Sequence, residues 1–284
     1  MAILGCGLLF TGWFGFNAGS ALSSGVRTVY PLCWIYFTTL HSVVLDVSFT
    51  SQVVSTSAVV STQIGGCVSG FIWMILSTCE RTGLHKTTEA ARRHQGPSLI
   101  ALMNGTIAGL AGITPAAGFI DSQASLCLGA VIGVVTFFSV QLIKHRFGVD
   151  DALDVSSVHG VSGLIGSVGV GLLASPAADP GLTHFGAFYG GGMHLLRAQL
   201  IGVCVAAVYS AVVTTLILLG TDCVCRRCFD SSIRVSDEEE AIGLDAAEYG
   251  QVAHTPITAE ADERTRGAGQ REPLLPGAGS LQYM

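Results

Sequence analysis

The most informative ionisable side chain is His159, which lies several residues inside an apolar run at 153–174. An ionisable group at that depth in a membrane-length segment is costly, so it usually faces a cavity or a pathway. A neutral imidazole donates a hydrogen bond from one nitrogen and accepts one at the other, which suits a proton relay through an apolar pore. A structural histidine bonded to a neighbouring backbone or hydroxyl group is the alternative.

Phe16 and Ser20 form a second candidate pair, within the first apolar run. Residues four apart share one face of a helix, so a ring and a hydroxyl are presented together. The ring attracts a small cation through its quadrupole, and the hydroxyl oxygen accepts a hydrogen bond from it. By spacing alone, ordinary helix packing explains the pair better.

Cys223, Cys225 and Cys228 flank two arginines, Arg226 and Arg227, directly after the last apolar run. Thiols beside basic residues at a membrane edge are candidates for reversible lipidation, that is palmitoylation. Zinc needs four ligands and no fourth lies close in sequence, so no metal site is expected. Free cytosolic thiols are the other interpretation.

Two further patterns surround His159. Three carboxylates precede it, Asp150, Asp151 and Asp154, and we expect them to cap a helix start because no partner base is visible. Glycines recur every third residue at 160, 163, 166 and 169, a stripe that lets a neighbouring helix approach closely. Because these carboxylates have no visible partner base, we expect no enzyme, no catalytic residue and no cofactor.

The composition describes the elements that must position these residues. Of 284 residues, 50% are apolar, 36 are glycine and only 12% are charged, which is about half the charge of a soluble domain. Of the 14 Lys/Arg and 20 Asp/Glu, 6 and 12 lie in 221–284, so the formal charge of −6 belongs to the tail. Without a basic stripe, nucleic-acid binding is disfavoured.

The apolar residues gather in runs of membrane-spanning length, about 20 residues each. Backbone groups in hydrocarbon need internal partners, so each run is expected to be a helix. The sequence therefore predicts an all-α polytopic transmembrane protein in a lipid bilayer, with one uncertain extra hydrophobic segment at 29–49. The six clearer runs are 2–22, 53–78, 98–118, 123–143, 153–174 and 199–220.

The basic residues of the connections indicate the orientation, because Lys and Arg favour the cytoplasmic side. They concentrate in 80–96, in 144–151 and just after 220, while the connections around Asp121 and at 175–198 are nearly free of them. We therefore predict a transmembrane domain at 1–220 and a cytoplasmic, acidic, largely disordered tail at 221–284. Within the tail, 238–250 has enough periodic apolar content to dock as a short element.

Four motifs, in the same order and with similar separation, resemble the Amt/Mep/Rh ammonium transporter family, and the likeness covers most of 1–220. A tail segment, G-L-D-A-A-E-Y-G at 243–250, is also similar to the family's cytoplasmic motif. The four motifs are G-W-F-G-F-N-A-G-S-A at 12–21, N-G-T-I-A-G-L-A-G-I-T-P-A-A-G-F at 104–119, V-D-D-A-L-D-V at 149–155 and V-H-G-V-S-G at 158–163.

The resemblance implies a homotrimer in the plasma membrane, with a narrow hydrophobic channel in each subunit. It implies that Phe16 matches a gating phenylalanine, Ser20 the hydroxyl of the outer ammonium vestibule, and His159 one of two pore histidines. Ammonium, or methylammonium, would be recruited outside and lose its proton, and ammonia would cross while the histidines assist the proton.

The chain departs from the family pattern in two ways. It resembles only about the second half of the family's eleven helices, so the residues supplied by the first half, including the other pore histidine, have no match. The stretch at 26–52 also has no counterpart. We interpret it as the translation of an in-frame intron, because Val codons begin with GT and a Gln codon can end in AG; a genuine insertion is the alternative.

Other classes of protein remain open at this point. A non-conducting regulatory or sensory subunit, or a non-functional truncated product, would keep the same motifs. A membrane oxidoreductase that binds haem needs paired axial ligands on facing helices, and His194 is the only further histidine near a span that fits beside His159.

Overall fold

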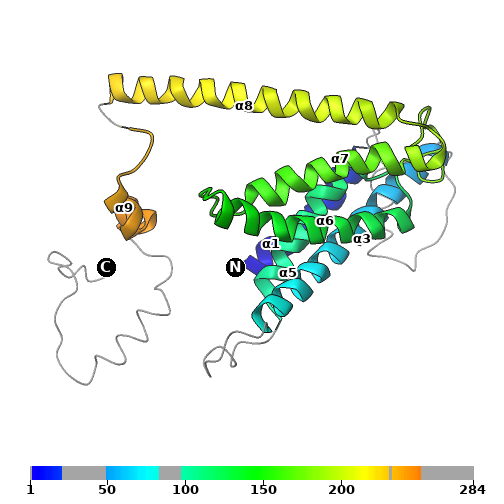
Figure 1. The fold of residues 1–284 in the computed structure, drawn as a ribbon, viewed down its shortest axis with the longest axis horizontal. Helices are drawn as coiled ribbons and strands as arrows, with labels where there is room; N and C mark the ends of the chain where they lie inside the picture. Colours follow the sequence, from blue (N-terminus) through cyan, green and yellow to red (C-terminus); the bar gives the residue numbers. More distant parts are fainter. Residues whose placement is uncertain (1, 21–48, 83–96, 230–231, 251–284) are drawn as a thin grey trace, which may run out of the picture. The chain divides into compact units, whose positions relative to one another are not determined.

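The computed structural model describes residues 2–20, 49–82, 97–229 and 232–250, and every regular element in these ranges is helical (Figure 1). Most of the atypical stretch at 26–52, including nearly all of the uncertain segment at 29–49, lies outside the described residues, as does the tail beyond 250. The chain divides into two compact units, Met1–Ser210 and Ala211–Met284, which we describe separately.

Six helical segments are long and apolar enough to cross a membrane, which confirms the predicted all-α polytopic class. Two of them contain a π-helical part, at Leu142–Arg146 after α6 and at Ser156–Val161 before α7, and a 3₁₀ turn at Thr114–Ala116 follows α5. The main helices are α1 (Ala2–Gly19), α3 (Phe49–Thr82), α5 (Leu99–Ile113), α6 (Ser122–Gln141), α7 (Ser162–Leu173) and α8 (His194–Cys228).

Helices α3, α5 and α6 form the centre of the first unit, and glycines bring their backbones together. A Cβ atom at Gly105 would lie 2.4 Å from the Cβ of Trp73, and one at Gly109 would lie 2.4 Å from the carbonyl oxygen of Gly65. Lipid tails are as apolar as the side chains, so helices associate in a membrane through close van der Waals packing, which such small residues allow. Glycines at these positions therefore allow α5 to pack closely against α3.

Polar side chains inside this unit are paired between helices. The Trp73 indole nitrogen donates to the Thr136 hydroxyl at 3.0 Å, joining α3 to α6, and the Asn17 amide donates to the Thr62 hydroxyl at 2.8 Å, joining α1 to α3. A polar group without a partner costs free energy in an apolar interior, so these pairs fix which helix faces meet.

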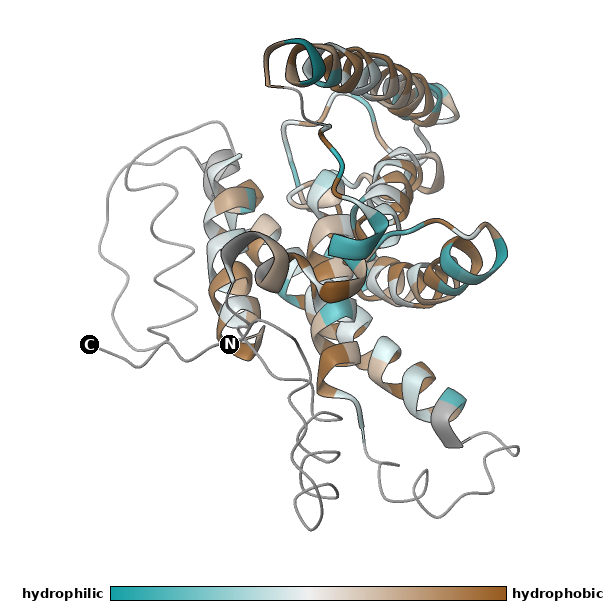
Figure 2. Ribbon diagram, turned by 90° about the vertical axis from the view of Figure 1, so that its left-hand side faces the viewer, coloured by the Kyte–Doolittle hydropathy of each residue, from teal (hydrophilic) through white to brown (hydrophobic). Residues whose placement is uncertain are grey.

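Apolar residues predominate along α8, the mostly brown helix at the top of Figure 2, while the other helices alternate brown with paler turns. On α8 only Leu196 is buried, and large side chains such as Ile201 and Leu216 are more than 60% exposed. A water-soluble monomer rarely exposes contiguous apolar surface of this extent, whereas a membrane protein presents it to lipid.

The second unit contains the C-terminal part of α8 and two short helices, α9 (Asp237–Ile242) and α10 (Leu244–Tyr249). A capping box starts α9: the Glu239 amide donates to the Ser236 hydroxyl, and the Glu239 carboxylate accepts from the Ser236 amide at 2.8 Å. Gly243, with φ of +99°, separates the two helices. The sequence predicted a short element in this region, and its docking on another surface stays a prediction.

Candidate functional site

His159 lies in the π-helical turn Ser156–Val161, and its side chain is exposed. Its imidazole makes no hydrogen bond with another residue in the part of the chain that the structure describes. The alternative interpretation, a structural histidine bonded to neighbouring polar groups, therefore has no support among the described residues. π-Helical turns inside helices occur frequently at functional sites, because the extra residue changes which side chains face a given direction.

Asp151 caps the start of this turn. Its carboxylate accepts from the Val155 amide at 2.9 Å, from the Ser156 amide at 2.8 Å and from the Ser156 hydroxyl. The Ser156 hydroxyl, followed by the Ser156 amide, holds the pKa of Asp151 below its usual value. The capping role predicted for this carboxylate is confirmed.

The other two carboxylates of the group behave differently. Asp154, with φ of +56°, forms an ion pair with Lys144 at 2.7 Å, which ties the π-helical end of α6 to the start of the next span. Asp150 is exposed and makes no side-chain hydrogen bond or ion pair with another described residue. The prediction that all three side chains cap the helix was therefore wrong for Asp150 and Asp154.

Ser162 closes the turn at its other end. In a π turn the backbone amides bond one residue further back than in an α-helix, and here the Ser162 amide reaches the Ser157 carbonyl. The buried Ser162 hydroxyl donates to the carbonyl of Val158, the residue before His159. Sequence reasoning missed this residue, because a serine within a glycine stripe is ordinarily interpreted as a small packing residue.

The glycine stripe after His159 has two parts. A Cβ atom at Gly166 would lie 1.9 Å from the Gly112 carbonyl oxygen of α5, and one at Gly169 would lie 2.8 Å from the Leu128 side chain of α6. At Gly160 and Gly163 nothing lies within 4 Å. The packing interpretation is thus correct for the second half of the stripe, while the first half leaves an open face beside His159.

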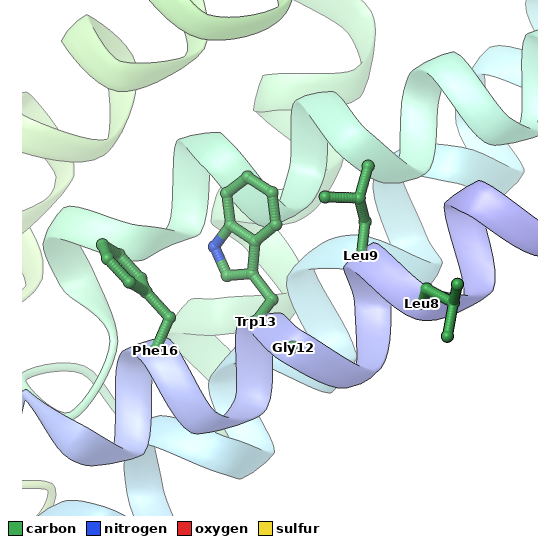
Figure 3. Close-up of a pocket in the computed structure, with 5 residues that line it drawn as sticks. All are labelled: Leu8, Leu9, Gly12, Trp13 and Phe16. Atoms are coloured by element: carbon green, nitrogen blue, oxygen red, sulfur yellow. The ribbon is translucent and has the colours of Figure 1, made fainter.

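Phe16 is 62% exposed on α1, where its ring meets the Trp13 indole edge-on at 6.4 Å. Trp13 is held in turn by Thr114, whose hydroxyl accepts from the indole nitrogen at 2.7 Å. Figure 3 shows the side chains of Leu9, Trp13 and Phe16 projecting from α1. Together with Leu8 and Gly12 they line an apolar pocket of about 420 Å³.

Ser20 lies one turn after Phe16, as the spacing predicted. Its hydroxyl donates to the Phe16 carbonyl oxygen at 2.9 Å, so its oxygen can still accept a hydrogen bond from a cation. No ring contact or side-chain hydrogen bond joins Phe16 or Ser20 to His159 among the described residues. Helix α5 packs against both the α1 helix and the His159 turn.

The connection before α8 holds two features that sequence reasoning missed. The Tyr189 hydroxyl donates to Asp121 at 2.5 Å, and Asp121 also caps α6 through the Ala124 amide at 2.8 Å. The Ala124 amide and then Tyr189 lower the pKa of Asp121. The ring of His194 stacks on that of His184 at 5.0 Å, and no ring contact joins it to His159 among the described residues.

The three cysteines lie on the last turns of α8, which ends at Cys228 and thus continues beyond the predicted run at 199–220. Cys223 and Cys228 are exposed and Cys225 is half-buried. Arg226 forms an ion pair with Asp222 at 2.7 Å. No group of three His, Cys, Asp or Glu side chains in the described part of the chain is arranged to hold a metal ion.

These features define a class: an integral membrane protein of spanning helices, with an unpaired imidazole on an open helix face and an exposed aromatic pair on another. The chain belongs to the Ammonium Transporter Family, whose model matches residues 1–254.

Among curated relatives, the chain is 38% identical over 263 residues to ammonium transporter 1 of Dictyostelium discoideum, covering 93% of the chain and 46% of that protein. It is 32% identical to ammonium transporter Amt1 of Archaeoglobus fulgidus, covering 90% and 52% respectively. The crystal structure of Candida albicans Mep2 superposes with a TM-score of 0.60 at 29% identity, covering 84% of this chain and 43% of that one. The chain therefore spans about half the length of the curated relatives it matches.

Proposed function

We propose that this chain acts in the transport of ammonium across a membrane. The observation that carries the proposal is the match to ammonium transporters along nearly the whole chain, joined to the exposed His159 on the π turn of a spanning segment. Because the chain spans about half of these relatives, the activity itself is the proposal, and only the family is established.

In this proposal Ser20 and Phe16 recruit ammonium, and His159 assists its proton. The hydroxyl oxygen of Ser20 accepts a hydrogen bond from the cation, and the Phe16 ring attracts it through its quadrupole. Hydrocarbon opposes the passage of a charged ion, so ammonia crosses as the neutral molecule after losing its proton. An imidazole can take up and release that proton near neutral pH without being consumed.

The surroundings of the site are also part of the proposal. We infer that the open face beside His159 is completed by the portion of the relatives that this chain does not span, and that the assembly is a homotrimer in the plasma membrane. The placement of Lys144, Arg146, Arg226 and Arg227 supports a cytoplasmic tail, because basic residues favour the inner side.

Uptake of labelled methylammonium tests the proposal in cells that lack their own ammonium transporters and express this chain fused to the portion of Dictyostelium discoideum ammonium transporter 1 that it does not span. We expect uptake that His159→Ala abolishes and that Phe16→Ala and Ser20→Ala each alter. His145→Ala is the matched control, because His145 is exposed on the other π-helical segment, outside the apolar run, and its loss leaves uptake unchanged.

Three results would contradict this assignment. Equal uptake by the His159→Ala variant would remove the role of the histidine, and unchanged uptake by both α1 variants would remove the roles of Phe16 and Ser20. Absence of uptake by the unmodified fusion, present in the membrane at normal amounts, would favour a non-conducting regulatory subunit.

A further inference from the structure

The C-terminal end of α8 places three thiols at the edge of a membrane. Residues 198–221 contain no Asp, Glu, Lys or Arg, and as a helix they extend for about 36 Å, enough to cross the roughly 30 Å of hydrocarbon. Asp222 is the first charged residue after this stretch, and Cys223, Cys225 and Cys228 follow it within two turns of the same helix. The thiols therefore lie at the depth of the lipid headgroups.

The thiols are accessible at this position. Cys223 and Cys228 are exposed, Cys225 is half-buried, and all three are free thiols. Cys225 and Cys228 are three residues apart and so share a face of the helix. A fatty acyl chain attached at either position can reach into the hydrocarbon beside the helix without a change in the backbone.

The neighbouring charges indicate which side of the membrane these thiols occupy. Arg226 and Arg227 are the last basic residues of α8, and Lys144 and Arg146 end the α6 span two spans earlier, so the pattern places both ends inside. The cytoplasm is reducing, which disfavours a disulfide between these cysteines. The inner leaflet is anionic, so the arginines and an acyl chain would hold the same helix end at the same surface.

We propose that Cys223, Cys225 and Cys228 are a site of reversible S-acylation by long-chain acyl-coenzyme A. The cysteine sulfur, as thiolate, attacks the acyl carbonyl, a new carbon–sulfur bond forms, and the bond between the acyl carbon and the coenzyme A sulfur breaks. The proton lost by the cysteine leaves with coenzyme A as its free thiol. Hydrolysis of the new thioester restores the cysteine and releases the fatty acid.

This modification acts on the second unit. Acylation anchors the end of α8 at the membrane surface, and α9 starts only nine residues after Cys228. The short helix α9, with its acidic first turn, and α10 after it are thereby kept close to the cytoplasmic surface. The inference is independent of the proposed transport function, since it needs only the membrane position of α8.

Acyl exchange on the full-length chain, produced in a eukaryotic host cell, tests the inference. Free thiols are blocked, thioesters are cleaved with hydroxylamine, and each released thiol receives a mass tag that retards the protein in a gel. We expect one to three tags on the unmodified chain and none on the Cys223→Ser, Cys225→Ser, Cys228→Ser triple variant. Elution of the triple variant as one symmetric peak in detergent shows that it is folded.

Cys204→Ser is the matched control, because Cys204 is an exposed thiol on the same helix, about five turns towards its N-terminal end. This variant keeps the tag pattern of the unmodified chain. Absence of hydroxylamine-dependent tags on the unmodified chain, or tags that persist in the triple variant, would overturn the proposal. So would labelling of Cys223 or Cys228 in intact cells by a membrane-impermeant maleimide.

Discussion

At the scale of single residues, the turn that carries His159 is bounded by one side chain that the sequence predicts, Asp151, and one that it does not, Ser162. Asp151 caps the first amides of the π turn, and Ser162 donates its hydroxyl to the Val158 carbonyl at the other end. Neither side chain forms a hydrogen bond with the imidazole, but both bond to backbone groups of the turn, and we expect them to hold its register. A shift of one residue in an α-helix rotates a side chain by about 100°, so the register decides where His159 points.

Asp151→Asn tests this role directly. An amide accepts weaker hydrogen bonds than a carboxylate, so we expect amide hydrogen exchange across 155–162 to become several-fold faster, with little change in α5 or α6. Asp150→Asn is the control, since Asp150 makes no side-chain bond among the described residues. Equal exchange in the two variants would show that the cap does not hold the turn.

The pH dependence of this cap follows from the lowered pKa of Asp151. Its folded-state pKa lies below the unfolded value of about 3.9, so the cap stabilises the fold fully above that value. The stabilisation is lost as the pH falls from the unfolded value through the lower folded one. In the unmodified chain, exchange at 155–162 relative to the intrinsic rate at each pH should therefore accelerate only below about pH 4, and Asp151→Asn should remove that acceleration.

At the scale of elements, the glycine stripe of the His159 span has two halves. Gly166 and Gly169 pack against neighbouring helices, whereas Gly160 and Gly163 lie on an open face. Gly166→Ala would place a Cβ 1.9 Å from the Gly112 carbonyl oxygen, and a backbone atom cannot move aside as a flexible side chain can. We expect destabilisation of about 1–3 kcal/mol, the usual cost of overpacking, seen as a lower thermal unfolding temperature in detergent.

Gly163→Ala is the matched control for this prediction, because a Cβ atom added at Gly163 would have nothing within 4 Å. Alanine is a better helix former than glycine, so this variant should unfold at an equal or higher temperature. A larger loss of stability from Gly163→Ala than from Gly166→Ala would show that Gly163, and not Gly166, is the packed position, which would contradict this assignment.

The sequence predicts the helices well and their finer structure poorly, for a physical reason. Apolar runs of spanning length are sufficient to identify the six helices, since hydrocarbon leaves the backbone no other arrangement. The π turn around His159 depends on which carbonyl each backbone amide bonds, which residue types alone do not determine. The Tyr189–Asp121 bond joins residues 68 apart in the chain. Phe16 was correctly placed on a helix, and Ser20 lies one turn later, directly after the end of α1, but nothing in their spacing indicates what faces them.

At the scale of the whole molecule, the chain spans about half the length of its relatives, and several of its helix faces are apolar and exposed. We expect some of these faces to meet the portion of the relatives that the chain does not span. The α1 pocket with Trp13 and Phe16 is one such surface, and the face of Gly160 and Gly163 is another. Apolar surfaces of this kind lie against lipid or against further protein. The proposed transport requires the second arrangement at His159, because an imidazole facing lipid has no water or substrate to exchange protons with.

The alternation of the spans is the last prediction, and it decides whether the site and the tail face the sides that transport requires. Single cysteines, in a chain whose native cysteines are replaced by serine, report this alternation in intact cells. Pro180→Cys lies in the connection between α7 and α8, where Pro180 is exposed and basic residues are scarce, and it should react with a membrane-impermeant maleimide. Asp150→Cys, at an exposed position in the connection between α6 and α7, should react only after the membrane is permeabilised. If both positions react from outside, the α7 segment does not cross the membrane, and His159 cannot lie in a pathway through it.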